Sequence, residues 1–108
     1  AAKLAGQCIS CCAHVIQGGG YAKELSLINH DRVDGHLTVE NADVTEVTRR
    51  LARTEGIFAG YSSGANIAGA HQLLRGEFKG KTIAVNICDS GLKYLSTDLW
   101  DDDLCTPA

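Results

Sequence analysis

Two short turns of small polar residues carry most of the chemistry that this sequence could perform. The first turn, Gly60-Tyr-Ser-Ser-Gly64, follows a brief apolar run at residues 57–59. It matches the G-x-S-x-G pattern of a hydrolase nucleophile elbow, but that chemistry needs an acid and then a histidine further along the chain. The only later histidine is His71, and it precedes every following aspartate. We therefore expect Ser62 to bind a ligand nitrogen by donating a hydrogen bond.

The second turn, Asp89-Ser90-Gly91, ends the nearly continuous apolar run at residues 82–88. Such runs are typical of parallel strands that are covered on both faces. Because open α/β sheets bind ligands beyond the carboxyl ends of their strands, both serine-containing turns should meet at one edge of the sheet. The helix predicted after Gly60 adds free N–H groups and a partial positive charge at the same place.

The residues before the first turn predict a strand and a helix. Residues 35–39 alternate as a strand does, and Asn41 is a good N-cap for the helix that follows. Gly56 is suited to end that helix. One apolar stripe runs along it, formed by Val44, Val47 and Leu51.

Three arginines, Arg49, Arg50 and Arg53, gather near the end of this helix. They could form a phosphate clamp, but a solvated helix end that complements the helix dipole is the favoured interpretation. A second helix runs to about residue 75. The order strand, helix, strand, helix, strand predicts an α/β fold, a βαβαβ piece of a parallel sheet with flanking helices and right-handed crossovers.

Composition and charge limit the classes of function. With 108 residues, of which 44% are hydrophobic, the chain forms one globular domain at most. A formal net charge of -3 gives no support for nucleic-acid binding, and no apolar run approaches the ~18 residues of a membrane span. We divide the chain into a poorly defined segment at 1–13, an α/β unit at 14–100 and an acidic tail at 101–108. The lack of Met and the start at Ala1 favour a piece of a longer protein over a trimmed mature chain.

Two other patterns could bind ligands, and each has a simpler explanation. The glycines of Gln17-Gly18-Gly19-Gly20 allow close approach to a ligand, yet they lack the lysine ending of a P-loop and the strand and acidic residue of a dinucleotide fingerprint. Half of a zinc site could be formed by Cys8, Cys11, Cys12 and His14, but no second pair follows with the same spacing. We therefore predict a flexible connection, no metal site, and thiols of a reducing cytoplasmic protein.

Three stretches together resemble a known family. They are Gln17-Gly-Gly-Gly20, residues 39–70, and Cys88-Asp-Ser-Gly-Leu-Lys-Tyr-Leu-Ser-Thr-Asp-Leu-Trp100. The chain from about residue 14 to residue 100 is similar to the C-terminal part of the cysteine synthase and cystathionine β-synthase family, which are pyridoxal-phosphate enzymes of fold type II. The most specific parts are Glu55-Gly-Ile-Phe-Ala-Gly-Tyr-Ser-Ser-Gly-Ala65 and Tyr94-Leu-Ser-Thr97.

The resemblance implies roles for the two turns and for the glycine loop. Ser62 would hydrogen-bond the pyridine nitrogen of pyridoxal 5'-phosphate, and Gly60 would let the backbone approach the cofactor. Asp89 and Ser90 would border the ring. The loop at Gln17 to Gly20 would line the active-site entrance and contact the substrate. A neutral hydroxyl does not hold the ring nitrogen protonated as a carboxylate would, which suits β-elimination.

The chain also departs from the family pattern. The family forms its Schiff base through a lysine in the N-terminal half, followed by an asparagine-containing substrate loop and a Gly/Thr-rich phosphate loop. This chain has five lysines, and none of them is followed by such loops. They are Lys3, Lys23, Lys79, Lys81 and Lys93. Tyr21 stands where a small residue is usual, and Cys88-Asp89 stands where Pro-Ser is frequent. We therefore predict no catalytic residue in this chain and no cysteine synthase activity from it alone.

The resemblance implies that a longer parent enzyme performs β-replacement on an activated serine, converting O-acetylserine and sulfide to cysteine. One alternative is a non-catalytic truncated paralogue that only folds or associates. A second is a cystathionine β-synthase or serine/threonine dehydratase-like activity in the parent. The implied partners are a small amino-acid substrate, a second subunit in a homodimer, and serine acetyltransferase. We expect neither nucleic acid nor a membrane among the partners.

Overall fold

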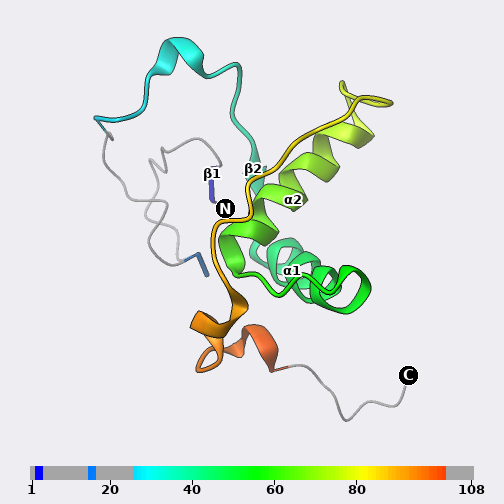
Figure 1. The fold of residues 1–108 in the computed structure, drawn as a ribbon. Helices are drawn as coiled ribbons and strands as arrows, with labels where there is room; N and C mark the ends of the chain where they lie inside the picture. Colours follow the sequence, from blue (N-terminus) through cyan, green and yellow to red (C-terminus); the bar gives the residue numbers. More distant parts are fainter. Residues whose placement is uncertain (1, 4–14, 17–25, 102–108) are drawn as a thin grey trace.

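Two helices dominate the structure. The computed structural model describes residues 2–3, 15–16 and 26–101 of the 108-residue chain. Helices α1 (Asn41–Glu55) and α2 (Tyr61–Arg75) have 15 residues each and pack against each other (Figure 1). Strand β2 (Thr38–Val39) leads into α1 and pairs antiparallel with β1 (Ala2–Lys3). The remaining elements are the 3-10 helices η1 (His30–Arg32), η2 (Gly91–Tyr94) and η3 (Asp98–Trp100).

Helix α1 forms where its apolar stripe predicts it. Val44 and Val47 are buried, and Leu51 is half-buried. Gly56 follows the last helical residue in the left-handed conformation, with φ of 67°, and its N–H donates to the Leu51 carbonyl. The predicted stripe and the predicted end of this helix are therefore confirmed. None of the helices in the described ranges is long and apolar enough to cross a bilayer.

The amino end of α1 differs from the prediction. Glu40 occupies the N-cap position with extended backbone and no side-chain capping bond, so Asn41 is the first helical residue. The Asn41 Oδ1 instead accepts a hydrogen bond from the Val15 N–H, at 3.4 Å. Because that amide belongs to a distant segment, the local capping pattern did not indicate it.

The two helices approach closely at Gly64. A Cβ at this position would overlap Thr48 Oγ1 and lie 2.8 Å from the Val44 carbonyl oxygen. Thr48 is fully buried, and its hydroxyl donates to the same carbonyl at 2.6 Å. Ala65 and Ala68 are also buried. The small residues of α2 thus allow close packing against α1.

The core lies between the helices and the C-terminal 3-10 turns. Its buried cluster comprises Val39, Val44, Val47, Tyr61, Ala65, Ala68, Tyr94 and Leu99.

Arg49 joins η3 to α1 through hydrogen bonds. Its Nε donates to the Leu99 carbonyl at 2.6 Å, and its Nη2 donates to the carbonyls of Asp98 at 2.8 Å and Asp101 at 2.9 Å. The prediction of a solvated helix end is therefore wrong for Arg49.

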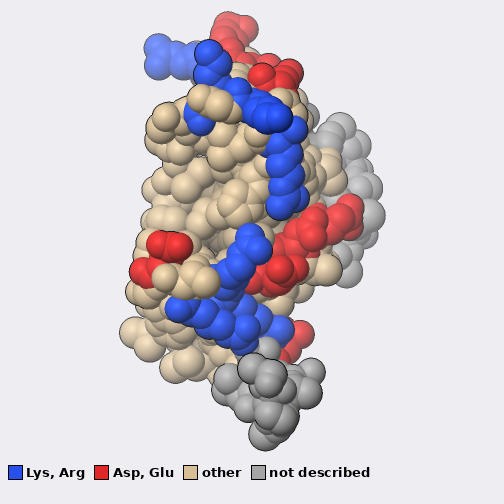
Figure 2. Space-filling model, turned by 90° about the vertical axis from the view of Figure 1, so that its right-hand side faces the viewer, with Lys and Arg blue, Asp and Glu red and all other residues tan. Residues whose placement is uncertain are grey.

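The charges on the outer face are mixed. Arg50 makes an exposed ion pair with Glu46 at 3.8 Å, one helical turn away. Figure 2 views the molecule from the right of Figure 1 and shows Lys and Arg side chains interspersed with Asp and Glu. This face carries no broad field of one sign, and the Arg49 guanidinium is already bound to carbonyls, so the phosphate-clamp alternative gains no support.

The predicted strands are present as extended segments without a parallel ladder. Within the described part of the chain, residues 57–59 make only an isolated antiparallel bridge, from Ala59 to Ser90. Residues 82–88 run back along α2 (Figure 1), where Asn66 Nδ2 donates to the Asn86 carbonyl at 2.8 Å. A buried parallel strand needs neighbours on its edges, and the described residues supply none. The domain boundaries near residues 13 and 100 stay predictions, because most of both end segments lies outside the described residues.

Candidate functional site

The two serine-containing turns meet at the amino end of α2. Gly60 is the N-cap residue of this helix, with extended backbone at φ of -93° and ψ of -174°. A Cβ at Gly60 would overlap Asp89 Oδ1 and the Tyr94 ring. The Gly91 N–H donates to the Phe58 carbonyl at 3.1 Å and so joins the two turns. The structure brings the turns together as the sequence predicts, but through turn and side-chain contacts in place of a sheet.

The two serines of the first turn have different surroundings. Ser63 is fully buried, and its Oγ accepts a hydrogen bond from the Cys88 N–H at 3.0 Å. Ser62 is half-buried, and its hydroxyl makes no hydrogen bond to any residue that the structure describes. A hydroxyl in this state, within the first turn of a helix whose N–H groups lack intrahelical partners, is available to a ligand. Ser63 therefore stabilises the fold, whereas the hydroxyl of Ser62 is available to a ligand.

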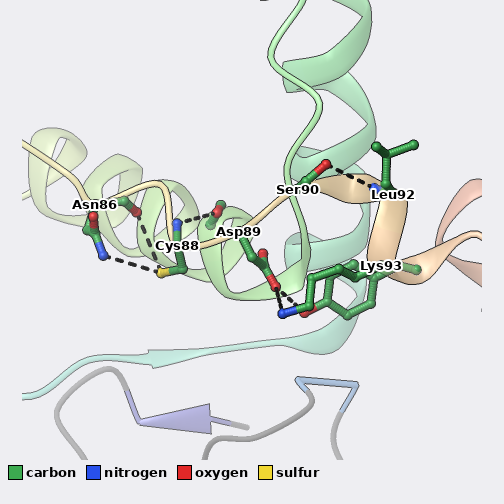
Figure 3. A network of polar contacts seen from close by, with 8 residues as sticks. Asn86, Cys88, Asp89, Ser90, Leu92 and Lys93 are labelled. Carbon is green, nitrogen blue, oxygen red and sulfur yellow. Dashed lines mark hydrogen bonds and ion pairs between the residues drawn. The ribbon is translucent and has the colours of Figure 1, made fainter.

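The Asp89 carboxylate is the centre of a polar network (Figure 3). Its Oδ2 accepts a hydrogen bond from the Tyr94 hydroxyl at 2.6 Å and lies 3.8 Å from Lys93 Nζ. Its Oδ1 is buried and has no hydrogen-bond partner among the described residues. Burial, and then the hydrogen bond with Asp89, raises the pKa of Tyr94 to about 12. The hydroxyl of Tyr94 therefore stays protonated and keeps donating at neutral pH.

The residues on either side of Asp89 shape this turn (Figure 3). Ser90 Oγ accepts a hydrogen bond from the Leu92 N–H at 3.2 Å and so caps η2. Cys88 is an exposed free thiol, and its Sγ lies 3.5 Å from Asn66 Nδ2 and 3.6 Å from Asn86 Nδ2. These bonds fix both ends of the turn and leave the hydroxyl proton of Ser90 available to a ligand.

Sequence reasoning missed the aromatic side chains that hold the turns in place. The Tyr61 hydroxyl donates to Asp98 Oδ1 at 2.9 Å, and its ring packs edge-on against Tyr94 with centroids 5.3 Å apart. The rings of Phe58 and Trp100 pack with centroids 4.5 Å apart. These contacts join residues far apart in the chain, so spacing carries no signal for them. The Tyr94 motif in the family resemblance was the one available hint.

Two sequence-predicted features lie outside the described residues. They are the loop at Gln17, Gly18, Gly19 and Gly20, and the cysteine group at Cys8, Cys11 and Cys12. Their proposed roles therefore stay predictions. In the ranges that the structure does describe, no group of three or more His, Cys, Asp or Glu side chains could hold a metal ion.

Known proteins resemble most of this chain in sequence and in structure. The family model for "Pyridoxal-phosphate dependent enzyme" matches residues 9–89. A cysteine synthase of Staphylococcus aureus (strain Mu50) is 39% identical over 90 residues, which are 83% of this chain and 29% of that protein. A solved cysteine synthase from Entamoeba histolytica has a TM-score of 0.74 and 34% identity, over 83% of this chain and 27% of its own.

A solved O-ureido-L-serine synthase has a TM-score of 0.76 and 33% identity, over 83% of this chain and 28% of its own. At these identities and TM-scores, the structural matches confirm the predicted α/β fold class. The chain spans less than a third of the length of the relatives that it matches.

Proposed function

Because the chain belongs to the family of pyridoxal-phosphate dependent enzymes, we propose that it forms the C-terminal portion of an enzyme that replaces the β-substituent of an activated serine. The complete enzyme would convert O-acetylserine and sulfide to cysteine. The cysteine synthase relatives support this choice of substrates. The likeness to an O-ureido-L-serine synthase makes the nucleophile the part of the reaction that most needs testing.

Three features at the amino end of α2 fit the family's cofactor, pyridoxal 5'-phosphate. Ser62 offers an uncommitted hydroxyl, and Gly60 has no side chain where its backbone meets Asp89. Asp89 Oδ1 is a buried acceptor without a donor among the described residues. When bound, the cofactor supplies an electron-deficient ring that stabilises negative charge at the substrate's α-carbon. Ser62 would hold the nitrogen-bearing edge of the ring, Gly60 would let the ring approach the backbone, and Asp89 would border the ring.

The contrast between Ser62 and Ser63 is the single observation that carries this proposal. Ser63 is committed to the Cys88 N–H, whereas the neighbouring hydroxyl of Ser62 has no such bond. In the proposed site, Ser62 hydrogen-bonds the ring nitrogen. A neutral hydroxyl stabilises the protonated nitrogen less than a carboxylate does. This would favour departure of the β-substituent over reactions that need a stronger electron sink.

The remaining parts of the proposal rest on the same family pattern. Asp89 and Ser90 would border the ring, with Ser90 also keeping η2 in place through its bond to the Leu92 N–H. The loop at residues 17–20 would contact the amino-acid substrate. We also propose a homodimer, with serine acetyltransferase as a further partner, acting in the cytoplasm.

We further propose that this chain does not catalyse the reaction alone. A lysine that forms a Schiff base is activated by burial in an apolar pocket or by a neighbouring cation. Lys93 lies at the site, but its side chain is 69% exposed and sits 3.8 Å from the carboxylate of Asp89. We therefore expect no turnover of O-acetylserine and sulfide by the purified 108-residue chain.

Titration of the purified chain with pyridoxal phosphate tests the binding role. The single tryptophan, Trp100, packs against Phe58 beside the site, so its fluorescence reports binding. We expect saturable quenching, and about three- to tenfold weaker binding for Ser62→Ala, the usual effect of one lost hydrogen bond. Borohydride treatment should leave no stoichiometric reduced adduct.

Ser63→Ala is the matched control. It removes a neighbouring hydroxyl that is bonded within the fold, so it should lower stability while changing affinity less than Ser62→Ala does. Equal affinity of the wild-type chain and Ser62→Ala, or an absence of saturable binding, would refute the proposed role of Ser62. A stoichiometric reduced adduct would show that a lysine of this chain forms the Schiff base.

A further inference from the structure

We propose that the extended segment at residues 82–88 binds the same segment of a second copy of this chain, as an antiparallel pair of strands. The segment reads Thr-Ile-Ala-Val-Asn-Ile-Cys and lies between Lys81 and Asp89. The pairing would make the 108-residue chain a reversible dimer. It goes beyond the proposed function and does not depend on it.

The backbone of this segment is largely unpaired. Two of its groups contact α2, since the Cys88 N–H donates to Ser63 Oγ at 3.0 Å (Figure 3) and the Asn86 carbonyl accepts from Asn66 Nδ2 at 2.8 Å. The N–H and C=O groups of residues 83, 85 and 87 make no hydrogen bond to any residue that the structure describes.

These unpaired groups lie on one edge of the segment. Alternate residues of an extended chain direct their N–H and C=O groups to opposite edges. The backbone groups of the even-numbered residues Asn86 and Cys88 contact α2, so those of the odd-numbered residues point away from these contacts. A row of unpaired N–H and C=O groups is a template for pairing with another chain.

The side chains of the segment also suit a paired strand. Thr82, Ile83, Val85 and Ile87 are β-branched and favour a strand conformation. Val85 is 38% exposed and Ile87 is 42% exposed. Soluble proteins usually protect an edge of this kind with charged side chains or proline, and residues 82–88 contain neither.

The order of residues favours an identical strand in antiparallel orientation. When Val85 faces Val85 of the partner subunit, Ile83 faces Ile87 of the partner subunit, and such β-branched cross-strand pairs stabilise a sheet. The same register places Lys81 opposite Asp89 of the partner subunit, so opposite charges meet at both ends. An in-register parallel pair would place like charges side by side. This charge complementarity selects a second copy related by a twofold axis.

The small size of the interface makes the association weak and reversible. Seven residues from each copy are fewer than the roughly 20–30 of a typical stable interface. Sedimentation velocity should therefore show a monomer at about 5 µM and a growing fraction of dimer towards about 500 µM. A monomer at every concentration would overturn the proposal and leave the edge to a strand of a longer parent enzyme.

Two substitutions of Val85 test the register. Val85→Lys and Val85→Glu each place two like charges face to face on the twofold axis, so each variant alone should remain monomeric at the higher concentration. An equimolar mixture of the two should form dimers again, because lysine then faces glutamate. A dimer of either variant alone, or a mixture that stays monomeric, would overturn the proposal.

Leu27→Lys is the matched control for charge. Leu27 is 98% exposed and lies outside the segment, so this variant should dimerise as the wild-type chain does. Loss of the dimer in Leu27→Lys would show that added charge alone prevents association and would overturn the assignment to residues 82–88. Circular dichroism verifies that every variant retains α1 and α2.

Amide hydrogen exchange tests the same edge in the wild-type chain, without any substitution. On pairing, the N–H groups of residues 83, 85 and 87 become hydrogen-bonded, whereas the Ala84 N–H points to the opposite edge. Exchange at the odd-numbered residues should therefore slow several-fold as the protein concentration rises, while exchange at Ala84 stays the same. Equal slowing at Ala84, or no slowing at Val85, would overturn the proposed pairing.

Discussion

Gly60→Ala tests most directly how the two turns meet. The backbone of Gly60 is extended, at φ of -93° and ψ of -174°, so alanine introduces no backbone strain. The new Cβ would overlap Asp89 Oδ1 and the Tyr94 ring, whose Cζ would lie at 2.9 Å. Tyr94 is 3% exposed and packs edge-on against Tyr61, so its ring has little room to move away.

The expected effect is a net loss of about 1–3 kcal/mol in the free energy of unfolding. Overpacking of this kind costs about 1–3 kcal/mol. Alanine is a poorer N-cap than glycine by about 0.5 kcal/mol, and the restricted unfolded chain offsets roughly the same amount. The melting temperature should fall by roughly 4–8 °C for each kcal/mol. Circular dichroism of α1 and α2 during urea and thermal unfolding measures both quantities.

Gly35→Ala is the control for this experiment. No atom lies within 4 Å of a Cβ at Gly35, so its stability should stay the same or rise by up to about 1 kcal/mol. Adding Asp89→Ala to Gly60→Ala removes one of the two overlaps and should recover part of the loss. An unchanged unfolding midpoint for Gly60→Ala would refute the described contact between the turns.

Three further predictions concern the packing around this site. Gly64→Ala should lower the free energy of unfolding by about 1–3 kcal/mol, because its Cβ would overlap Thr48 Oγ1. A double-mutant cycle with Thr48→Ala, measured by urea unfolding, tests this, and additive losses would contradict the overlap. Arg49→Lys should lower the free energy of unfolding by about 1–3 kcal/mol, measured by thermal unfolding, since lysine lacks the forked guanidinium that reaches three carbonyls. The exposed Arg50→Lys is the control and should leave this free energy nearly unchanged. The pKa of Tyr94 is raised to about 12. Its contribution to the free energy of unfolding is therefore complete below the unfolded pKa near 10 and is lost as the pH rises towards about 12. Unfolding at about pH 9 and about pH 11 measures this loss, which should be smaller in Tyr94→Phe; the pKa of Tyr61 is also raised, so part of the loss remains.

The helices could be predicted because their determinants are local. Val44 and Val47 share one face, and Gly56 ends α1 in the left-handed conformation that glycine favours. The role of Arg49 could not be predicted in this way, because its carbonyl partners lie 49 to 52 residues further along the chain. A dipole argument alone indicated a solvated end for this side chain.

The sequence indicated the two turns that the structure brings together at the amino end of α2, but it did not indicate the different surroundings of their side chains. The motif indicated the turn that holds Ser62, and the family resemblance indicated Asp89. Ser63 differs from Ser62 because its Oγ meets the Cys88 N–H, a contact across 25 residues. The unsatisfied oxygen of Asp89 likewise depends on Tyr94 occupying the other oxygen, which no spacing rule indicates.

The sequence predicts a sheet that the described residues do not form, and residues 82–88 show why. Their apolar side chains suit a strand covered on both faces, yet Val85 is 38% exposed and Ile87 is 42% exposed. The pattern therefore specifies an environment that the described part of this chain does not supply by itself.

The candidate site does not depend on that ladder. The Ser63–Cys88 bond and the Gly91–Phe58 bond hold both turns at the amino end of α2. These contacts involve side chains and turn backbone, so they form without neighbouring strands. In the described part of the chain, the turn contacts therefore fix how the groups at this end of α2 face one another.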